Sequence, residues 1–242
     1  DKLAHQLHQT YECKATKPEA VKEQVKYEIA LRRFIQQKGV QAITDTFEDL
    51  HGLKQLPGLA IQRIHASGIG FSAEGDYKTS ALSAIFMKMA EGKKGSTGFM
   101  EDYTYDFKNE LVLGSHMLEV SESFAATKPS IEVHPLGIGG KEDPARLVFD
   151  GVTGEGISVC MTDMGTHFRI ICAAIELVKQ PKPMPNLPVA RIMWKIKPDF
   201  KSGIKAWLEA GGGHHTVVST ALTVEDVKLF AKLTQTELIV IK

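Results

Sequence analysis

The sequence predicts a mixed α/β protein in two portions. Residues 1–96 are expected to form an α/β portion with Rossmann-like layers, and residues 97–242 a mainly antiparallel β-barrel or sandwich with a few helices. Two observations carry this prediction. Up to about Gly95, segments with helical spacing alternate with a β-rich run, which is typical of α/β layers. After it, short β-rich segments recur between turn signals such as DGVTGEG (150–156), as in antiparallel barrels and sandwiches.

The N-terminal portion opens with a long predicted helix. Residues 16–39 carry apolar residues at near-helical spacing, with Pro18 near the start and Gly39 at the end, where helices favour them. A β-rich run over 40–47 and predicted helices over 59–68 and 78–92 follow.

The C-terminal portion is expected to consist of short strands with two helices near its end. The β-rich segments span 99–107, 111–120, 130–138, 145–151, 156–164 and 167–178. The Pro-rich stretch 179–188 reads as a surface connection to the final segment. Helices are predicted over 201–213 and over 223–235, the second opening with a capping-box pattern from Thr223 to Asp226, and an apolar strand over 237–242 ends the chain.

The composition is that of an ordinary globular protein, with 43% hydrophobic and 24% charged residues. Lys plus Arg and Asp plus Glu number 29 each, so no basic excess indicates a nucleic-acid partner. No apolar run approaches the roughly 20 residues of a membrane span. The three cysteines form no CxxC pair, which favours a reduced, cytoplasmic protein. Because the sequence starts without Met, we expect its start to be a cut.

Four residues have the chemistry of ligands for a hard divalent metal ion, which takes carboxylate and imidazole donors from several chain segments. They are Glu74 before a predicted helix, Glu101 and His116 within apolar β-rich segments, and His215 after three glycines and a second histidine. A charged side chain is costly to bury unless it is paired or binds a metal. This argument is strongest for Glu101 and His116.

Each of these residues also has a purely structural interpretation. Glu74 could stabilise the first turn of the following helix through its dipole, and Glu101 could point to solvent from a half-exposed strand. His116 could be a hydrogen-bonded core histidine. His214 and His215 would face opposite sides of an extended segment, or both could lie exposed in a polar loop. The spacings match no local metal motif such as HExxH, so the residues alone leave these alternatives open.

Two glycine-rich stretches and the cysteines are not expected to carry chemistry. GIGGK (137–141) lacks the spacing of a phosphate-binding loop and predicts a tight turn. GFSAEG (70–75) lacks the GxSxG pattern of a nucleophile elbow. The cysteines, which have no local histidine partner, are expected in the core: Cys13, Cys160 and Cys172.

Six longer motifs occur in order along the chain: TFEDLHGLKQLPGLAIQR (46–63), AEGDYKTSAL (73–82), FMEDYTYDF (99–107), LVLGSHMLEV (111–120), LGIGGKEDPARLVF (136–149) and AGGGHHTV (210–217). Together they resemble the bacterial L-arabinose isomerase family, over essentially the whole sequence. By this resemblance, residues 1–96 correspond to the central domain of the family and residues 97–242 to its catalytic C-terminal domain.

The resemblance implies a site with one divalent ion per subunit, usually Mn²⁺, with Co²⁺ also accepted. The implied ligands are Glu74, Glu101, His116 and His215. The implied neighbours of these ligands are His214, which supports the ring or the loop, Asp76, which assists the ligands, and Phe47, Met117 and Ile138, which line the sugar pocket.

The implied reaction converts L-arabinose to L-ribulose, and also D-galactose to D-tagatose, because a pocket discriminates weakly against one additional CH₂OH group. Glu74 and Glu101 would move the proton of an enediol mechanism, one as base and one as acid. The family forms hexamers in which an N-terminal region, which we expect this chain to lack, completes the pocket of a neighbour. The alternative is a fragment that binds metal and sugar with little turnover. A metal-dependent hydrolase would need a nucleophile site that we do not find.

Overall fold

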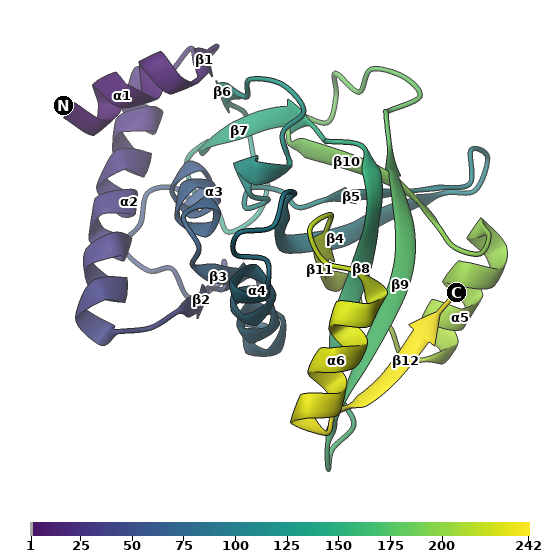
Figure 1. Cartoon of the computed structure of the whole chain (residues 1–242). Helices are drawn as coiled ribbons and strands as arrows, with labels where there is room; N and C mark the ends of the chain where they lie inside the picture. Colours follow the sequence, from purple (N-terminus) through teal and green to yellow (C-terminus); the bar gives the residue numbers. More distant parts are fainter. Residues whose placement is uncertain (1) are drawn as a thin grey trace.

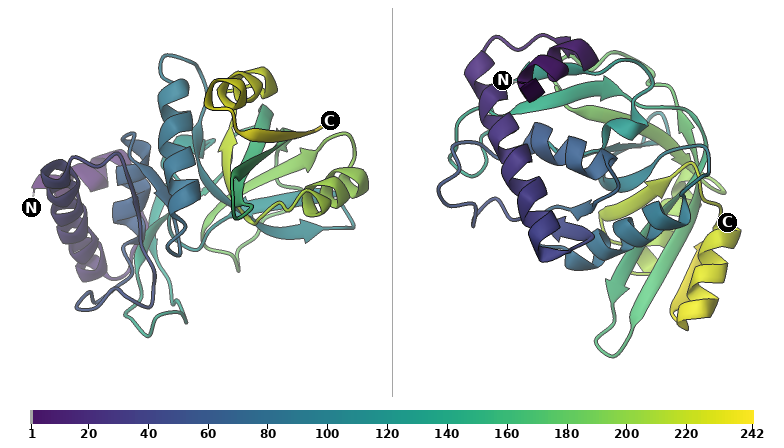
Figure 2. Two further views of the ribbon diagram at one scale, coloured as in Figure 1. Left: turned by 90° about the horizontal axis from the view of Figure 1, so that it is seen from below. Right: turned by 60° about the vertical axis from the view of Figure 1, so that its left-hand side comes forward.

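The computed structural model describes residues 2–242, in which twelve strands, six α-helices and one short 3-10 helix occur. The strands form one ten-stranded sheet and one two-stranded sheet. Figures 1 and 2 show α1, α2 and α3 at one side of the large sheet and α5 and α6 at the opposite side. The prediction of a mixed α/β chain with a large, mostly antiparallel sheet is therefore confirmed.

The N-terminal third carries four helices and a small parallel sheet. Its elements are α1 (Lys2–Thr10), β1 (Glu12–Cys13), α2 (Pro18–Lys38), β2 (Ala42–Thr44), α3 (Gly58–Ala66), β3 (Gly70–Ser72) and α4 (Tyr77–Met89). The helix α2 ends where Gly39 takes a left-handed conformation, with φ of 64°. Strands β2 and β3 pair in parallel, and β3 is buried throughout.

The remaining elements belong to the large sheet or pack on it. They are β4 (Thr97–Asp106), β5 (Leu111–Ser115), η1 (Glu122–Phe124), β6 (Ser130–Val133), β7 (Ala145–Asp150), β8 (Gly154–Asp163), β9 (Phe168–Val178), β10 (Ala190–Ile196), α5 (Phe200–Glu209), β11 (His215–Ser219), α6 (Val224–Thr234) and β12 (Glu237–Ile241). The capping box predicted between Thr223 and Asp226 is present at the start of α6.

The strands of the large sheet follow the order β1-β6-β7-β10-β5-β4-β11-β8-β9-β12. Strand β10 also pairs with β9, so the pairings that run from β10 through β5, β4, β11, β8 and β9 return to β10. Each pairing within this ring is antiparallel, whereas β1–β6, β7–β10 and β9–β12 are parallel. The middle of the sheet, β5–β4–β11, is where the candidate residues gather.

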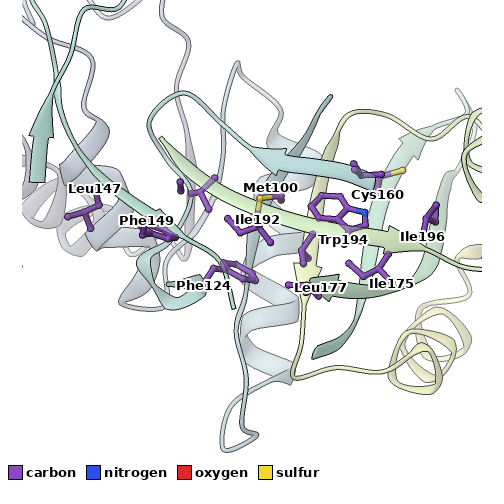
Figure 3. Packing of buried hydrophobic residues seen from close by; sticks show 14 of the residues in the cluster. Met100, Phe124, Leu147, Phe149, Cys160, Ile175, Leu177, Ile192, Trp194 and Ile196 are labelled. Atoms are coloured by element: carbon purple, nitrogen blue, oxygen red, sulfur yellow. The ribbon is translucent and has the colours of Figure 1, made fainter. Parts of the chain in front are cut away.

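The main core lies beneath these strands and is centred on Trp194 of β10, which is 1% exposed (Figure 3). Its indole ring lies directly against Gly114 of β5, because a Cβ atom at Gly114 would come within 1.9 Å of the ring. Met100 of β4 belongs to the same cluster. The strands that carry the candidate residues therefore rest on a closely packed core, which restricts their movement.

Several details differ from the sequence-based expectations. The helix α1 and the strands β1, β3 and β10 were not predicted, and the Pro-rich stretch joins β9 to β10 within the sheet. The strand expected over 111–120 ends at Ser115. Cys13 is exposed rather than in the core, because β1 is a two-residue strand at the sheet edge, whereas Cys160 and Cys172 are buried as expected. None of the described helices is both long and apolar enough to cross a membrane.

Candidate metal centre

Three adjacent strands bring three of the four candidate ligands together. On β4, Glu101 lies opposite His215 of β11 on one side and opposite Ser115 of β5 on the other. His116 directly follows Ser115, where β5 ends. In an antiparallel sheet, directly opposed side chains share one face, with Cβ atoms about 5 Å apart. The sheet register therefore places Glu101 and His215 on one face, and His116 comes directly after the residue that lies opposite Glu101 on β5.

The loop before β11 explains the run of glycines that precedes His214. Gly211 has a φ of +88°, which favours glycine, and a Cβ atom at Gly212 would lie 2.3 Å from Nε1 of Trp207. The indole N–H of Trp207 donates a hydrogen bond to the carbonyl oxygen of Gly213. The glycines thus let the backbone pass across the Trp207 ring, and β11 then starts at His215.

The fourth candidate ligand, Glu74, lies in the loop between β3 and α4 in a strained conformation. Its φ is +59°, in the left-handed region that non-glycine residues seldom occupy. The conformation is held by the next residues: Gly75 donates its N–H to the carbonyl oxygen of Asp45 at 2.8 Å, and Asp76 caps α4 by accepting from the Thr79 N–H. Strain of this kind persists where the surrounding structure imposes it and is common at functional sites.

The four side chains form two imidazole–carboxylate pairs. Nε2 of His116 lies 4.0 Å from Oε2 of Glu101, and Nε2 of His215 lies 3.6 Å from Oε2 of Glu74. The two imidazole ring centres are 6.0 Å apart. Since metal bonds to nitrogen and oxygen are about 2.0–2.2 Å, two ligands of one ion lie at most about 4.4 Å apart, and both pairs meet this limit.

His214 also lies at this centre. Potential ligand atoms of Glu74, His214 and His215 all lie within 4.8 Å of one another, so these three could share one ion. The rings of His214 and His215 have centres 4.5 Å apart. His214 is exposed and His215 is buried. The cluster thus includes His214, which was expected to play a supporting role. Glu101 and His116 lie outside this cluster and form the second imidazole–carboxylate pair.

Each buried imidazole is held at its Nδ1 atom by a carboxylate. Nδ1 of His116 bonds to Oε2 of Glu119, and Nδ1 of His215 lies 3.3 Å from Oδ2 of Asp76. Histidine ligands of metals commonly donate the second ring N–H to a carboxylate, which fixes the tautomer and the ring orientation. Here both rings are therefore oriented with Nε2 towards a glutamate.

These carboxylates shift the proton affinities of the site. Burial disfavours the charged form of His116, yet the Glu119 carboxylate outweighs it and raises the pKa of His116 to about 9. Burial alone would raise the pKa of Asp76, but hydrogen bonds from His215 and Thr79 hold it well below its ordinary value. Asp76 therefore stays a carboxylate and accepts from the N–H of His215.

One buried atom of the site has no hydrogen-bond partner. Nε2 of His215 is inaccessible to solvent and unpaired, although the side chain is held at Nδ1. A buried polar atom without a partner is costly and calls for an explanation such as a bound ion. Its position 3.6 Å from a carboxylate oxygen of Glu74, with a second imidazole–carboxylate pair alongside, fits a divalent cation.

A pocket of about 300 Å³ opens beside the carboxylates. Its lining includes the predicted ligands Glu74, Glu101 and His116 and the predicted sugar-pocket residues Phe47, Met117 and Ile138. The structure does not place every candidate there, because His214, His215 and Asp76 line a neighbouring hollow, also of about 300 Å³. The centre therefore lies between the two hollows.

Three residues of the site were not found from the sequence. Glu119 follows His116 by three residues within an apolar run, so the argument applied to Glu101 would have found it. Asp45 lines the pocket, and burial together with the charge of Glu119 raises its pKa to about 7. Phe99 packs edge-on against both His116 and His215, which no local pattern indicates. The GIGGK stretch is a turn as predicted, in which Lys141 donates to the carbonyl oxygens of Leu50 and Leu53.

Comparison with known proteins matches the chain to two family descriptions. Residues 1–92 match the L-arabinose isomerase central domain and residues 96–237 the L-arabinose isomerase C-terminal domain. The chain is 54% identical over 225 residues to L-arabinose isomerase 2 of Bacillus licheniformis, covering 92% of this chain and 47% of that protein. It is 53% identical over 225 residues to the L-arabinose isomerase of Oceanobacillus iheyensis, covering 92% and 47%. The chain spans about half the length of the curated relatives it matches.

Proposed function

The chain belongs to the L-arabinose isomerase family, and on this premise we propose that it carries the metal-binding catalytic centre of an aldose–ketose isomerase that converts L-arabinose to L-ribulose. The observation that carries the proposal is the matched pair of imidazoles. Each is oriented by a carboxylate at Nδ1 and directs Nε2 to a glutamate, Glu101 for His116 and Glu74 for His215.

We propose that Glu74, Glu101, His116 and His215 hold one Mn²⁺ ion, with Co²⁺ as a substitute, since mixed oxygen and imidazole donors suit both. When bound, such an ion polarises the sugar oxygens at C1 and C2 and stabilises the negative charge that develops on them. A metal ligand must be deprotonated, so His116 gives up the proton that Glu119 favours in the free protein. His214 supports this centre from the edge of the cluster.

The proton transfers between C1 and C2, and between O1 and O2, fall to the two glutamates. Both line the pocket, Glu101 from β4 and Glu74 from the strained loop, so one can accept a proton from the sugar while the other donates one. Their side chains differ in exposure, at 22% for Glu101 and 44% for Glu74, which gives the two carboxylates different surroundings. His116 and His215 keep the two carboxylates in place, because all four side chains would bind the same ion.

We further propose that Phe47, Met117 and Ile138 form the apolar wall against which the sugar lies. The pocket of about 300 Å³ is at the lower end of the range for small-molecule sites, which suits a pentose. Such a wall discriminates weakly against one more CH₂OH group, so we expect D-galactose to be converted to D-tagatose as a slower second reaction.

The architecture of the chain within the family is also a proposal. We infer that residues 1–96 and 97–242 correspond to its central and C-terminal domains, that β2 and β3 belong to Rossmann-like layering, and that the ring of pairings from β10 to β9 closes a barrel. We also propose that the chain associates with copies of itself, as the resemblance to the family implies.

The second candidate function is a metal- and sugar-binding fragment with little turnover. It is supported by the chain's coverage of about half of its relatives, since catalysis depends on positioning that can be worth ~7–11 kcal/mol. A ribulose assay with Mn²⁺ and L-arabinose, run beside a full-length relative, tests both. Ribulose formation abolished by Glu101→Gln supports the isomerase. Calorimetric Mn²⁺ and sugar binding without ribulose supports the fragment, and absence of Mn²⁺ binding overturns both.

A further inference from the structure

We propose that His65, at the end of α3, is a positioning residue for the metal centre, because it holds the backbone of Phe99 so that the Phe99 ring stays packed against both His116 and His215. This inference rests on the proposed function, in which the two histidines act as ligands. His65 itself contacts neither of them in the hydrogen bonds and ring contacts of the structure.

The hydrogen bonds of His65 define its chemical state. Nδ1 lies 2.8 Å from the carbonyl oxygen of Ile69, which can only accept, and Nε2 lies 2.9 Å from the backbone N–H of Phe99, which can only donate. The imidazole is therefore neutral, with its proton on Nδ1 and a lone pair on Nε2. The side chain is completely buried, and burial lowers the pKa of His65 to about 4, so this state persists at neutral pH.

The side chain that His65 positions is the ring of Phe99. Its centre lies 5.2 Å from that of His116 and 5.3 Å from that of His215, in edge-to-face geometry with both. Phe99 stands two residues before Glu101 on β4, so the two side chains share one face of the strand. Any rotation of β4 at Phe99 would therefore move the ring that packs against both histidines and also the carboxylate of Glu101.

The contact between His65 and β4 is close and specific. A Cβ atom at Gly98 would lie 2.5 Å from Nε2 of His65, so only glycine lets the strand approach the imidazole this closely. Phe71 of β3 completes the link, because its ring lies 6.4 Å from His65 and 5.7 Å from Phe99. These contacts join α3 and β3, in the region matched by the central-domain family, to the strand that carries Glu101.

A purely structural role would also make His65 important, so the test must separate stability from positioning. Replacement by glutamine or by asparagine tests the two ring nitrogens of His65 separately. The amide of His65→Gln reaches the position of Nε2 and can accept from the Phe99 N–H, whereas that of His65→Asn reaches only the position of Nδ1 and leaves the Phe99 N–H buried without an acceptor.

A matched control lies on the same helix. Arg63 of α3 pairs with Glu28 at 2.8 Å and donates to the Tyr11 hydroxyl at 2.7 Å, and it contacts no residue of the metal centre in these bonds. Arg63→Met should therefore lower the stability of the α2–α3 packing without changing the geometry of β4.

The experiment measures Mn²⁺ affinity by titration calorimetry, melting temperature, and the ring-proton NMR shifts of His116 and His215 in metal-free protein. We expect His65→Asn to weaken Mn²⁺ binding about tenfold, at the lower end of what loss of an outer partner costs, and to shift both ring signals. His65→Gln should bind within about threefold of the parent, and Arg63→Met should lose stability while affinity and ring signals stay unchanged.

The inference is overturned if His65→Asn changes neither the ring signals of His116 and His215 nor the Mn²⁺ affinity. This holds whatever the melting temperature of that variant. If His65→Asn does not fold, Gly98→Ala displaces the imidazole from the other side and should give the same shifts. If the parent protein binds no Mn²⁺, the proposed metal centre fails. The ring signals then still decide the positioning role, because they are recorded without metal.

Discussion

Glu101 and His215 lie directly opposite one another on the antiparallel strands β4 and β11, although 114 positions separate them in the chain. This register puts a carboxylate and an imidazole on the same face of the sheet. Because the strands on both sides of β4 belong to a continuous sheet over the main core, the pair is held by backbone hydrogen bonds rather than by its own side chains. A site of this kind is expected to be largely formed before any ligand arrives.

Metal addition should therefore stabilise the fold. Binding to the folded state alone adds about 2.7 kcal/mol when the free ion is at 100 times its dissociation constant, so saturating Mn²⁺ should raise the melting temperature relative to excess EDTA. His215→Ala should abolish this increase, and His214→Ala should reduce the affinity by about 10–100-fold. Thermal melts and titration calorimetry measure both effects. If His214→Ala abolishes Mn²⁺ binding and His215→Ala only weakens it, the roles of the two histidines are exchanged.

Replacement of Glu119 should weaken the centre through His116. In Glu119→Gln the Nδ1 atom loses a charged partner, so the pKa of His116 should fall from about 9, and Mn²⁺ affinity should fall by about 10–100-fold. The ring signals of His116 in an NMR pH titration follow the first effect, and calorimetry follows the second. An unchanged His116 titration would show that Glu119 does not set the proton affinity of that ring.

The strained backbone of Glu74 predicts a trade between stability and binding. Asparagine tolerates the left-handed conformation better than glutamate, so Glu74→Asn should make the metal-free protein more stable by about 1 kcal/mol while it weakens Mn²⁺ binding. Glu110, with φ of 54° in the β4–β5 turn, is a matched control, and Glu110→Asn should give the same gain with unchanged affinity. Urea unfolding in the presence of EDTA measures the gain in the free energy of unfolding. If Glu74→Asn is less stable than the parent while Glu110→Asn is more stable, the backbone at Glu74 is not strained.

Acid should remove the stability that neutral His65 provides. The pKa of His65 is about 4 in the folded protein against 6.5 when unfolded, so only the unfolded chain takes up the proton between these values. The contribution is complete above pH 6.5 and is lost as the pH falls towards 4. At about 1.4 kcal/mol per pKa unit, the stability of the parent relative to His65→Gln should drop by about 3 kcal/mol over this window. A difference that is constant with pH would mean that His65 is not neutral and buried in the fold.

The elements that the sequence predicted well are those with a local signal. The helix α2 carries its apolar spacing, its first-turn proline and its terminal glycine within one segment, and α6 carries its capping box. The strand β10 was missed although it pairs with three other strands of the sheet. Its sequence ARIMWKI carries no turn or cap signal of its own, and two of its three partners, β5 and β7, are remote in the chain.

The sequence by itself determined the mixed α/β class, the residue types of the candidate site, and, through its motifs, the family. The residues alone left open whether Glu101 faced solvent and which histidine of the pair turned inward, and His215 was chosen only through the family resemblance. Only the tertiary structure decided these points, because the register of β11 on β4 puts His215 on the same face as Glu101, and the β3–α4 loop brings Glu74 and Asp76 to the His215 ring. The contacts of Glu119, Phe99 and His65 likewise depend on through-space packing, which a linear pattern does not encode.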